Sequence, residues 1–255
     1  MVSVFMSSLS HSQNHKSKSK VGANQLEFLG IEHNKMLDKV YKFIKNNELS
    51  DENGKLMIEN FLVEQISSNE KYTEKSNQIG INYIRNLFDN KIDLYKLNYK
   101  PVINPNIVNN YINELENILD SFQLSDDSVI MEIKNLEDDI EKSKRLSESD
   151  MIALFSSTQI AQYSINYWTE NLDKWLSLEN PESNTGINQK MDGPGPGGKI
   201  AAADAAGAIG GAAGAWAVNI VPGAGQAAYG GAILGGAVGG SVATGVSELL
   251  DYFGW

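Results

Sequence analysis

The stretch "VNNYINELENILDSF", residues 108–122, decides the fold class because its apolar side chains recur at steps of three and four residues. The recurring positions are Val108, Tyr111, Ile112, Leu115, Ile118, Leu119 and Phe122. This period places them on one face of an α-helix, which is typical of a helix that packs against a core. The stretch therefore predicts an amphipathic helix.

The same period continues on both sides of this stretch. It is found in "NQLEFLGIEHNKMLDKVYKFIKNN" (24–47), in "SDENGKLMIENFLVEQI" (50–66) and in the long stretch 147–180, which opens with a capping-box pair, Ser147 and Asp150. No alternating β pattern closed by a hairpin turn is found. We therefore predict an all-α fold, with a helical bundle of five or six helices followed by a Gly/Ala-rich two-helix hairpin.

Changes in composition divide the chain into four parts. Residues 1–23 are expected to be a disordered arm or the remnant of a signal peptide, with an intact signal peptide as a further alternative. Residues 24–180 form the bundle, and the Gly/Pro-rich residues 181–198 form a linker. Residues 199–255 are predicted to form a glycine-zipper hairpin.

Composition excludes several classes of function. The net charge of −11 argues against general nucleic-acid binding, which needs a basic face. The absence of cysteine excludes disulfides, thiol chemistry and Cys-ligated metal sites. The aromatic side chains of 147–180 are expected in the bundle core or in helix contacts, with a ligand pocket or a membrane belt as alternatives.

The remaining signals of chemistry are weak. His33 has no histidine or acid at metal-binding spacing, so we expect it at a boundary or on the surface. The acidic pair Asp138–Asp139 is expected on a solvated helix face. The glycine run in "GPGPGGK" (193–199) lacks the spacing of a phosphate-binding loop. We predict no catalytic, cofactor-binding or metal-binding residue and no enzyme activity.

The tail has an unusual pattern, because no charged residue lies between Asp204 and Glu248 and most residues there are Gly or Ala. The sequence "NIVPGAG" around Pro222 divides this stretch into two arms, each about as long as a bilayer core is thick if helical. Many glycines recur every four residues, a spacing that allows two helix backbones to approach closely. The residues expected in helix packing or membrane contact are Gly207, Gly210, Gly211, Gly214, Gly231, Gly235, Gly236, Gly239, Gly240 and Trp216.

The sequence leaves three interpretations of the tail open. It inserts into a membrane as a glycine-zipper hairpin, it packs in water against the bundle or against its own copies, or it is a flexible low-complexity segment. Each glycine costs an isolated helix in water roughly 1 kcal/mol relative to alanine, which favours the first interpretation. A tail so poor in large side chains is only weakly hydrophobic, and it could stay in water before it inserts.

The segment "AAGAIGGAAGAWAVNIVPGAGQAAYGGAILGGAVGGSVATGV" resembles the glycine-zipper segments of bacteriocins and related membrane-associated bacterial proteins. The resemblance covers residues 199–250 and implies helices that pair within a target membrane and make it permeable. Such bacteriocins are short and cationic and carry a double-glycine leader, whereas this chain is long and acidic and we expect no such leader. The stretch "TQIAQYSINYWTENLDKWL" resembles secreted or lipoprotein-like proteins of Bacteroidota, which implies no particular activity.

Together these observations predict a bacterial protein that is secreted or associated with the cell envelope. Its expected partners are membrane lipid, further copies of itself through the tail, and an immunity or receptor protein, with no cofactor and no nucleic acid. The alternative function is a non-toxic structural or interaction protein that uses the tail for anchoring or self-assembly.

Overall fold

The computed structural model describes residues 21–47, 49, 53–68, 74–89, 105–120, 127–178, 199–208 and 234–253. Every regular element in these ranges is helical, which confirms the predicted all-α class. The elements are η1 (Ala23–Leu26), α1 (Glu27–Asn46), α2 (Gly54–Ser67), α3 (Glu74–Phe88), α4 (Pro105–Asp120), α5 (Asp127–Lys142), α6 (Glu148–Leu176), a helical segment over 199–208, η3 (Leu234–Val238) and α9 (Gly239–Phe253).

Local signals explain where two of the helices begin. Pro105 is the first residue of α4, a position where the missing N–H of proline costs nothing. The N-terminus of α6 carries the predicted capping box, in which the Ser147 hydroxyl accepts from the Asp150 backbone and the Asp150 carboxylate accepts from the Ser147 backbone N–H. Both signals lie in the local sequence, and the predicted capping box at Ser147 is confirmed.

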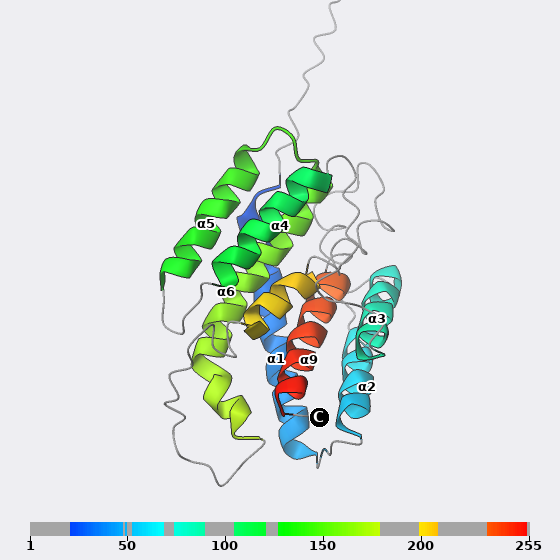
Figure 1. Ribbon diagram of the computed structural model, residues 1–255. Helices are drawn as coiled ribbons and strands as arrows, with labels where there is room; N and C mark the ends of the chain where they lie inside the picture. The colour runs from blue at the N-terminus through cyan, green and yellow to red at the C-terminus, as the bar shows by residue number, and fades with distance from the viewer. Residues whose placement is uncertain are drawn as a thin grey trace, which may run out of the picture.

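Helix α6 is the central element of the bundle (Figure 1). It contacts α1 along one side and α4 and α5 along another. The hairpin of α2 and α3 lies on the far side of α1 and α9 from α5. Twenty residues of α6 are buried, so this helix is enclosed over most of its surface rather than along one stripe.

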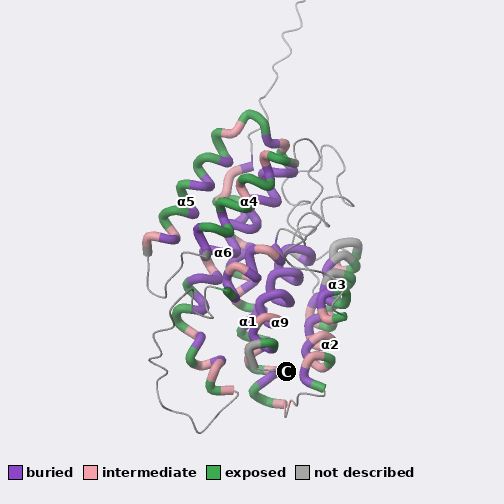
Figure 2. The backbone as a smooth tube through the Cα atoms, viewed as in Figure 1, coloured by how far each residue is buried: buried purple, intermediate pink, exposed green. Residues whose placement is uncertain are grey.

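The described parts of the tail lie inside the same hydrophobic core as the earlier helices. Val238, Val242 and Val246 are fully buried and belong to one cluster with apolar residues of α1, α2, α3 and α6. Figure 2 shows α9 buried along most of its length, whereas α4 and α5 alternate between buried and exposed turns. These two tail segments are therefore packed in the bundle; the linker 181–198 and residues 209–233 lie outside the described residues, and the hairpin stays a prediction.

Candidate functional site

The candidate site is the point where segment 199–208 meets α1, α6 and α9, and its centre is the fully buried carboxylate of Asp204. The Ser164 hydroxyl donates to Asp204 Oδ2 at 2.5 Å, and the indole Nε1–H of Trp168 donates to the same oxygen at 2.9 Å. Ser164 and Trp168 are four residues apart on α6, so one helix face presents both donors. These bonds hold a tail helix against the central helix of the bundle.

His33 of α1 completes the polar cluster, and its position corrects the sequence prediction of a boundary or surface residue. Its side chain is fully buried, with Nε2 3.3 Å from Asp204 Oδ2 but not aligned for a hydrogen bond. The other ring nitrogen, Nδ1, lies 2.9 Å from Asn34 Oδ1, while Asn34 Nδ2 donates to the Tyr163 carbonyl at 3.1 Å. The Asn34 oxygen can only accept, so Nδ1 carries a proton. The prediction failed because the partner of His33 lies far along the chain.

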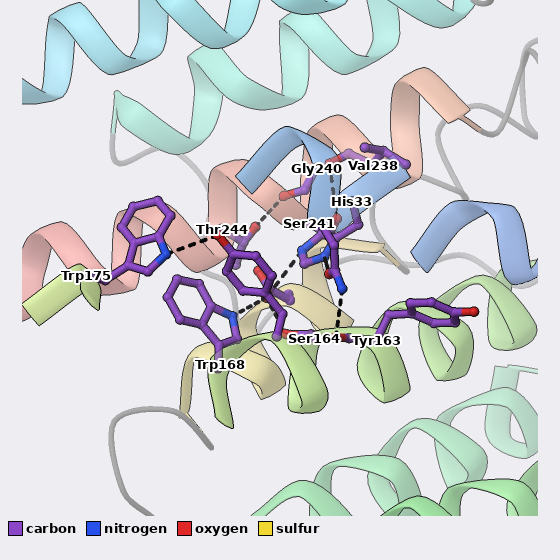
Figure 3. Close-up of polar contacts among 12 residues, drawn as sticks. His33, Tyr163, Ser164, Trp168, Trp175, Val238, Gly240, Ser241 and Thr244 are labelled. Atoms are coloured by element: carbon purple, nitrogen blue, oxygen red, sulfur yellow. Dashed lines mark hydrogen bonds and ion pairs between the residues drawn. The ribbon is translucent and has the colours of Figure 1, made fainter. Parts of the chain in front are cut away.

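His33, Ser164 and Trp168 point toward one place from α1 and α6 (Figure 3). The second carboxylate oxygen of Asp204, Oδ1, has no hydrogen-bond partner and faces Gly245 of α9. A Cβ atom at Gly245 would lie 1.9 Å from Oδ1, so only glycine leaves room for the carboxylate. The polar cluster thus imposes a requirement on α9 as well.

A second contact joins the two described tail segments through bare backbone. A Cβ at Gly207 would lie 2.5 Å from the carbonyl oxygen of Gly240 and 2.6 Å from Thr244 Oγ1. Ser157 of α6 adds a further tie, because its hydroxyl donates to the carbonyl of Ala205 at 2.9 Å. Close approach of this kind gives van der Waals contact in place of absent side chains.

The other predicted tail residues are distributed as follows. Gly235 lies against α3, where a Cβ at Gly80 would meet its carbonyl oxygen at 2.5 Å, and Gly239 lies against Ile66 of α2. Gly236 is buried. The remaining predicted positions lie outside the described residues: Gly210, Gly211, Gly214, Gly231 and Trp216. Gly235 and Gly239 therefore lie against the α2–α3 pair, whereas Gly240 lies against segment 199–208.

The aromatic residues of α6 lie in helix contacts. Trp168 and Trp175 are fully buried with ring centroids 5.3 Å apart, and Tyr41 of α1 packs edge-on against Trp175. Trp175 Nε1 donates to the Tyr167 hydroxyl, which donates to Asp38 Oδ1 at 3.1 Å. Burial raises the pKa of Tyr167 above its usual value. This cluster joins the C-terminal half of α6 to α1.

The polar face of α6 that holds the tail was not predicted from the sequence. Ser157, Ser164 and Trp168 are spaced by seven and four residues, which places them on one helix face. Asp204 is the only charge within an alanine run, "AAADAAGA". A buried acid needs hydrogen-bond donors, so the polar face of α6 and the single acid in the alanine run together could have predicted this contact.

The geometry of the cluster does not suit catalysis. The Ser164 hydroxyl donates to a carboxylate rather than to the imidazole, so the serine and the histidine do not form a nucleophile–base pair. All four side chains, those of His33, Ser164, Trp168 and Asp204, are fully buried. Among the described residues no group of three His, Asp or Glu side chains is placed to hold a metal ion. The cluster fixes the tail in the bundle.

No protein-family model matches the chain, and neither a curated protein nor a solved structure matches it. Within the described ranges, no helix combines the length and the apolar character that crossing a bilayer requires.

Proposed function

We propose that this chain is a bacterial secreted or envelope protein that carries a membrane-active glycine-zipper tail folded into a helical bundle. The observation that carries the proposal is the position of the tail. Two segments of the Gly/Ala-rich tail occupy the bundle core and contact each other and α3 through glycine backbone. A segment packed in this way is kept from water until it is released.

The chemistry of the tail supports transfer to lipid. Its apolar surface is modest, so leaving the bundle for water is not prohibitive, whereas in a bilayer helical backbone satisfies its own hydrogen bonds. The pairing of Gly207 with Gly240 shows that two tail helices fit against each other without large side chains. The same contact can be kept in a membrane, where small residues favour helix association.

The charges at the ends of the stretch fit such an insertion. Asp204 precedes the uncharged residues and Glu248 follows them, so both acids remain near the ends of the inserted segment. An acid at the centre of a membrane helix costs roughly 2.5 to 3.5 kcal/mol, and this cost falls toward the headgroups. We propose membrane lipid and further copies of the tail as the partners.

A covalent lock tests the proposal. The exposed pair Lys55 on α2 and Asp251 on α9 has Nζ and Oδ1 2.7 Å apart. The chain has no cysteine, so Lys55→Cys with Asp251→Cys introduces the only two thiols, which a short bismaleimide can join. The joined protein should lose most of its ability to release dye from phosphatidylethanolamine–phosphatidylglycerol vesicles. Each single-cysteine variant, treated with the same reagent, is the matched control and should leak like the unmodified chain.

One observation favours the second candidate function, a non-toxic structural or interaction protein. The described tail is buried as deeply as any helix of the bundle, and Asp204 ties it to α6 by two hydrogen bonds. In that case the tail is a permanent part of the core. Vesicles that stay intact with the unlocked chain, together with unchanged tail burial in their presence, would support this function and reject membrane activity.

A further inference from the structure

Helix α9 has two faces of different character. One face meets segment 199–208, and the other meets the hairpin of α2 and α3. In Figure 1, α9 lies between the unlabelled segment at 199–208 and this hairpin. The two faces differ in what would replace their contacts if the protein met a bilayer.

The face toward α2 and α3 makes apolar contacts. Ile66 and Ile84, both fully buried, lie 3.1 and 3.8 Å from the position of a Cβ at Gly239. Gly80 and Gly235 bring the two backbones together. The Lys55–Asp251 ion pair also joins the hairpin to α9, but it is exposed, and exposed pairs contribute little to stability.

The hairpin also contacts α1. Phe43 of α1 stacks on Phe61 of α2 with ring centroids 4.3 Å apart, and Lys39 Nζ donates to Gln65 Oε1 at 3.0 Å on the exposed surface. Both rings are only partly buried. α2 and α3 follow each other in the chain and pack against each other, so the hairpin can move as one unit.

The opposite side of the tail is held by groups that lipid cannot replace. Asp204 receives bonds from Ser164 and Trp168, and the Ala205 carbonyl receives one from Ser157. Acyl chains are as apolar as isoleucine, so they can take the place of Ile66 and Ile84 at little cost. They offer no donor to a carboxylate, so breaking the Asp204 bonds leaves a costly unpaired group.

From this asymmetry we infer that the α2–α3 hairpin is a cover over the lipid-binding face of α9, and that it leaves before segment 199–208 separates from α6. The inference rests on the proposed function and specifies its first step. The face that is uncovered carries Gly239 of α9 and Gly235 of the preceding η3, and its occupant after opening is the acyl region of a bilayer. The bonds of Asp204 break later or not at all.

A substitution at Gly80 tests this order. In Gly80→Ala the new methyl would lie 2.5 Å from the Gly235 carbonyl oxygen, so α3 must move away from η3. Overpacking of this kind should speed amide hydrogen exchange in α2 and α3 by about tenfold or more, while exchange in 199–208 keeps its rate. Gly22→Ala is the control, because a Cβ there meets only Glu141 Oε1 at 3.9 Å. The control should change neither rate.

Two smaller substitutions keep the test possible if Gly80→Ala fails to fold. Ile84 on α3 and Ile133 on α5 are both fully buried. Ile84→Val should speed exchange in α2–α3 and dye release from the vesicles by about threefold to tenfold, and Ile133→Val should leave both unchanged.

Hydrogen exchange tests the cover, and dye release tests the proposed membrane function. If segment 199–208 and α3 accelerate in equal proportion, or if neither responds, the cover is rejected whatever the vesicles do. If α2–α3 opens first but no variant or wild-type chain releases dye, the cover stands and the proposed membrane function fails.

Discussion

Asp204 and Glu137 are both largely buried carboxylates that join another element to α6, yet their surroundings differ. Glu137 of α5 receives three side-chain donors on one oxygen, Oε1: Thr158 at 2.6 Å, Gln159 at 2.8 Å and Gln162 at 2.9 Å. Glu137 retains 8% exposure, whereas Asp204 is fully buried and its Oδ1 has no donor.

The tail is therefore held at a higher electrostatic cost than α5. A buried carboxylate with an unpaired oxygen is costly, and replacing a buried charged group together with its partners by well-packed apolar residues is often neutral or stabilising. An apolar contact between 199–208 and α6 would also allow sliding, whereas two bonds to Asp204 fix one register. The arrangement fits a tail that must occupy one position while it is folded.

Loss of the Asp204 carboxylate should give the largest effect. Asp204→Ala leaves the Ser164 hydroxyl and the Trp168 N–H buried without this acceptor, at roughly 1 to 3 kcal/mol each. We expect a loss of about 2 to 5 kcal/mol in the free energy of unfolding, measured by urea denaturation. Asp204→Asn keeps an acceptor oxygen and should lose less. An Ala variant as stable as the wild type would show that the bonds do not hold the tail.

Gly245 tests whether the unpaired oxygen needs a glycine beside it. Gly245→Ala places a methyl 1.9 Å from Asp204 Oδ1, and the carboxylate can turn away only by breaking its bonds to Ser164 and Trp168. Overpacking should cost about 1 to 3 kcal/mol, although alanine is the better helix former by about 1 kcal/mol.

A double-mutant cycle gives the control for this prediction. With Asp204→Ala already present the clash is gone, so Gly245→Ala should be neutral or stabilising by up to about 1 kcal/mol. Equal costs in both backgrounds would show that Gly245 is required for another reason.

Glu137 should show a smaller effect than Asp204, although it receives more donors. Glu137→Ala removes the acceptor of Thr158, Gln159 and Gln162. Thr158 is fully buried but also donates to the Phe155 carbonyl at 3.2 Å, and the two glutamines keep slight exposure, so we expect a loss of about 1 to 2 kcal/mol. Glu137→Gln keeps the acceptor oxygen and should lose about half as much. A loss larger than that of Asp204→Ala, measured in the same urea series, would reverse the comparison.

The fold was largely predictable from sequence because its determinants are local. The period of Val108, Leu115 and Leu119 requires no distant partner, and all three are buried as predicted. The capping box at Ser147 is equally local. Segments with a one-sided apolar stripe therefore gave reliable helices.

The candidate site was only partly predictable because its contacts join distant parts of the chain. The glycine spacing indicated close helix approach, and Gly207 and Gly240 do meet, but the spacing could not say that Gly235 would meet Gly80 of α3. The burial of His33 was not predicted because Asp204, its neighbour, lies far along the chain. Periodicity describes a helix face and gives no information on which distant face covers it.

Glu248 of α9 extends the comparison to a half-buried acid. Burial, and secondly the charge of Asp251, raise the pKa of Glu248 above its usual value, with Lys199 opposing. A raised folded-state pKa means that the ionised form is disfavoured, so this group lowers stability as pH rises from its unfolded value of 4.5 through the folded value. Glu248→Gln should therefore gain less than about 1 kcal/mol at pH 7 and nothing at pH 4, because the site is partly solvated. Glu170→Gln, at an exposed position of α6, is the matched control in the same denaturation series. An equal gain at both pH values would assign the effect of Glu248→Gln to packing instead of charge.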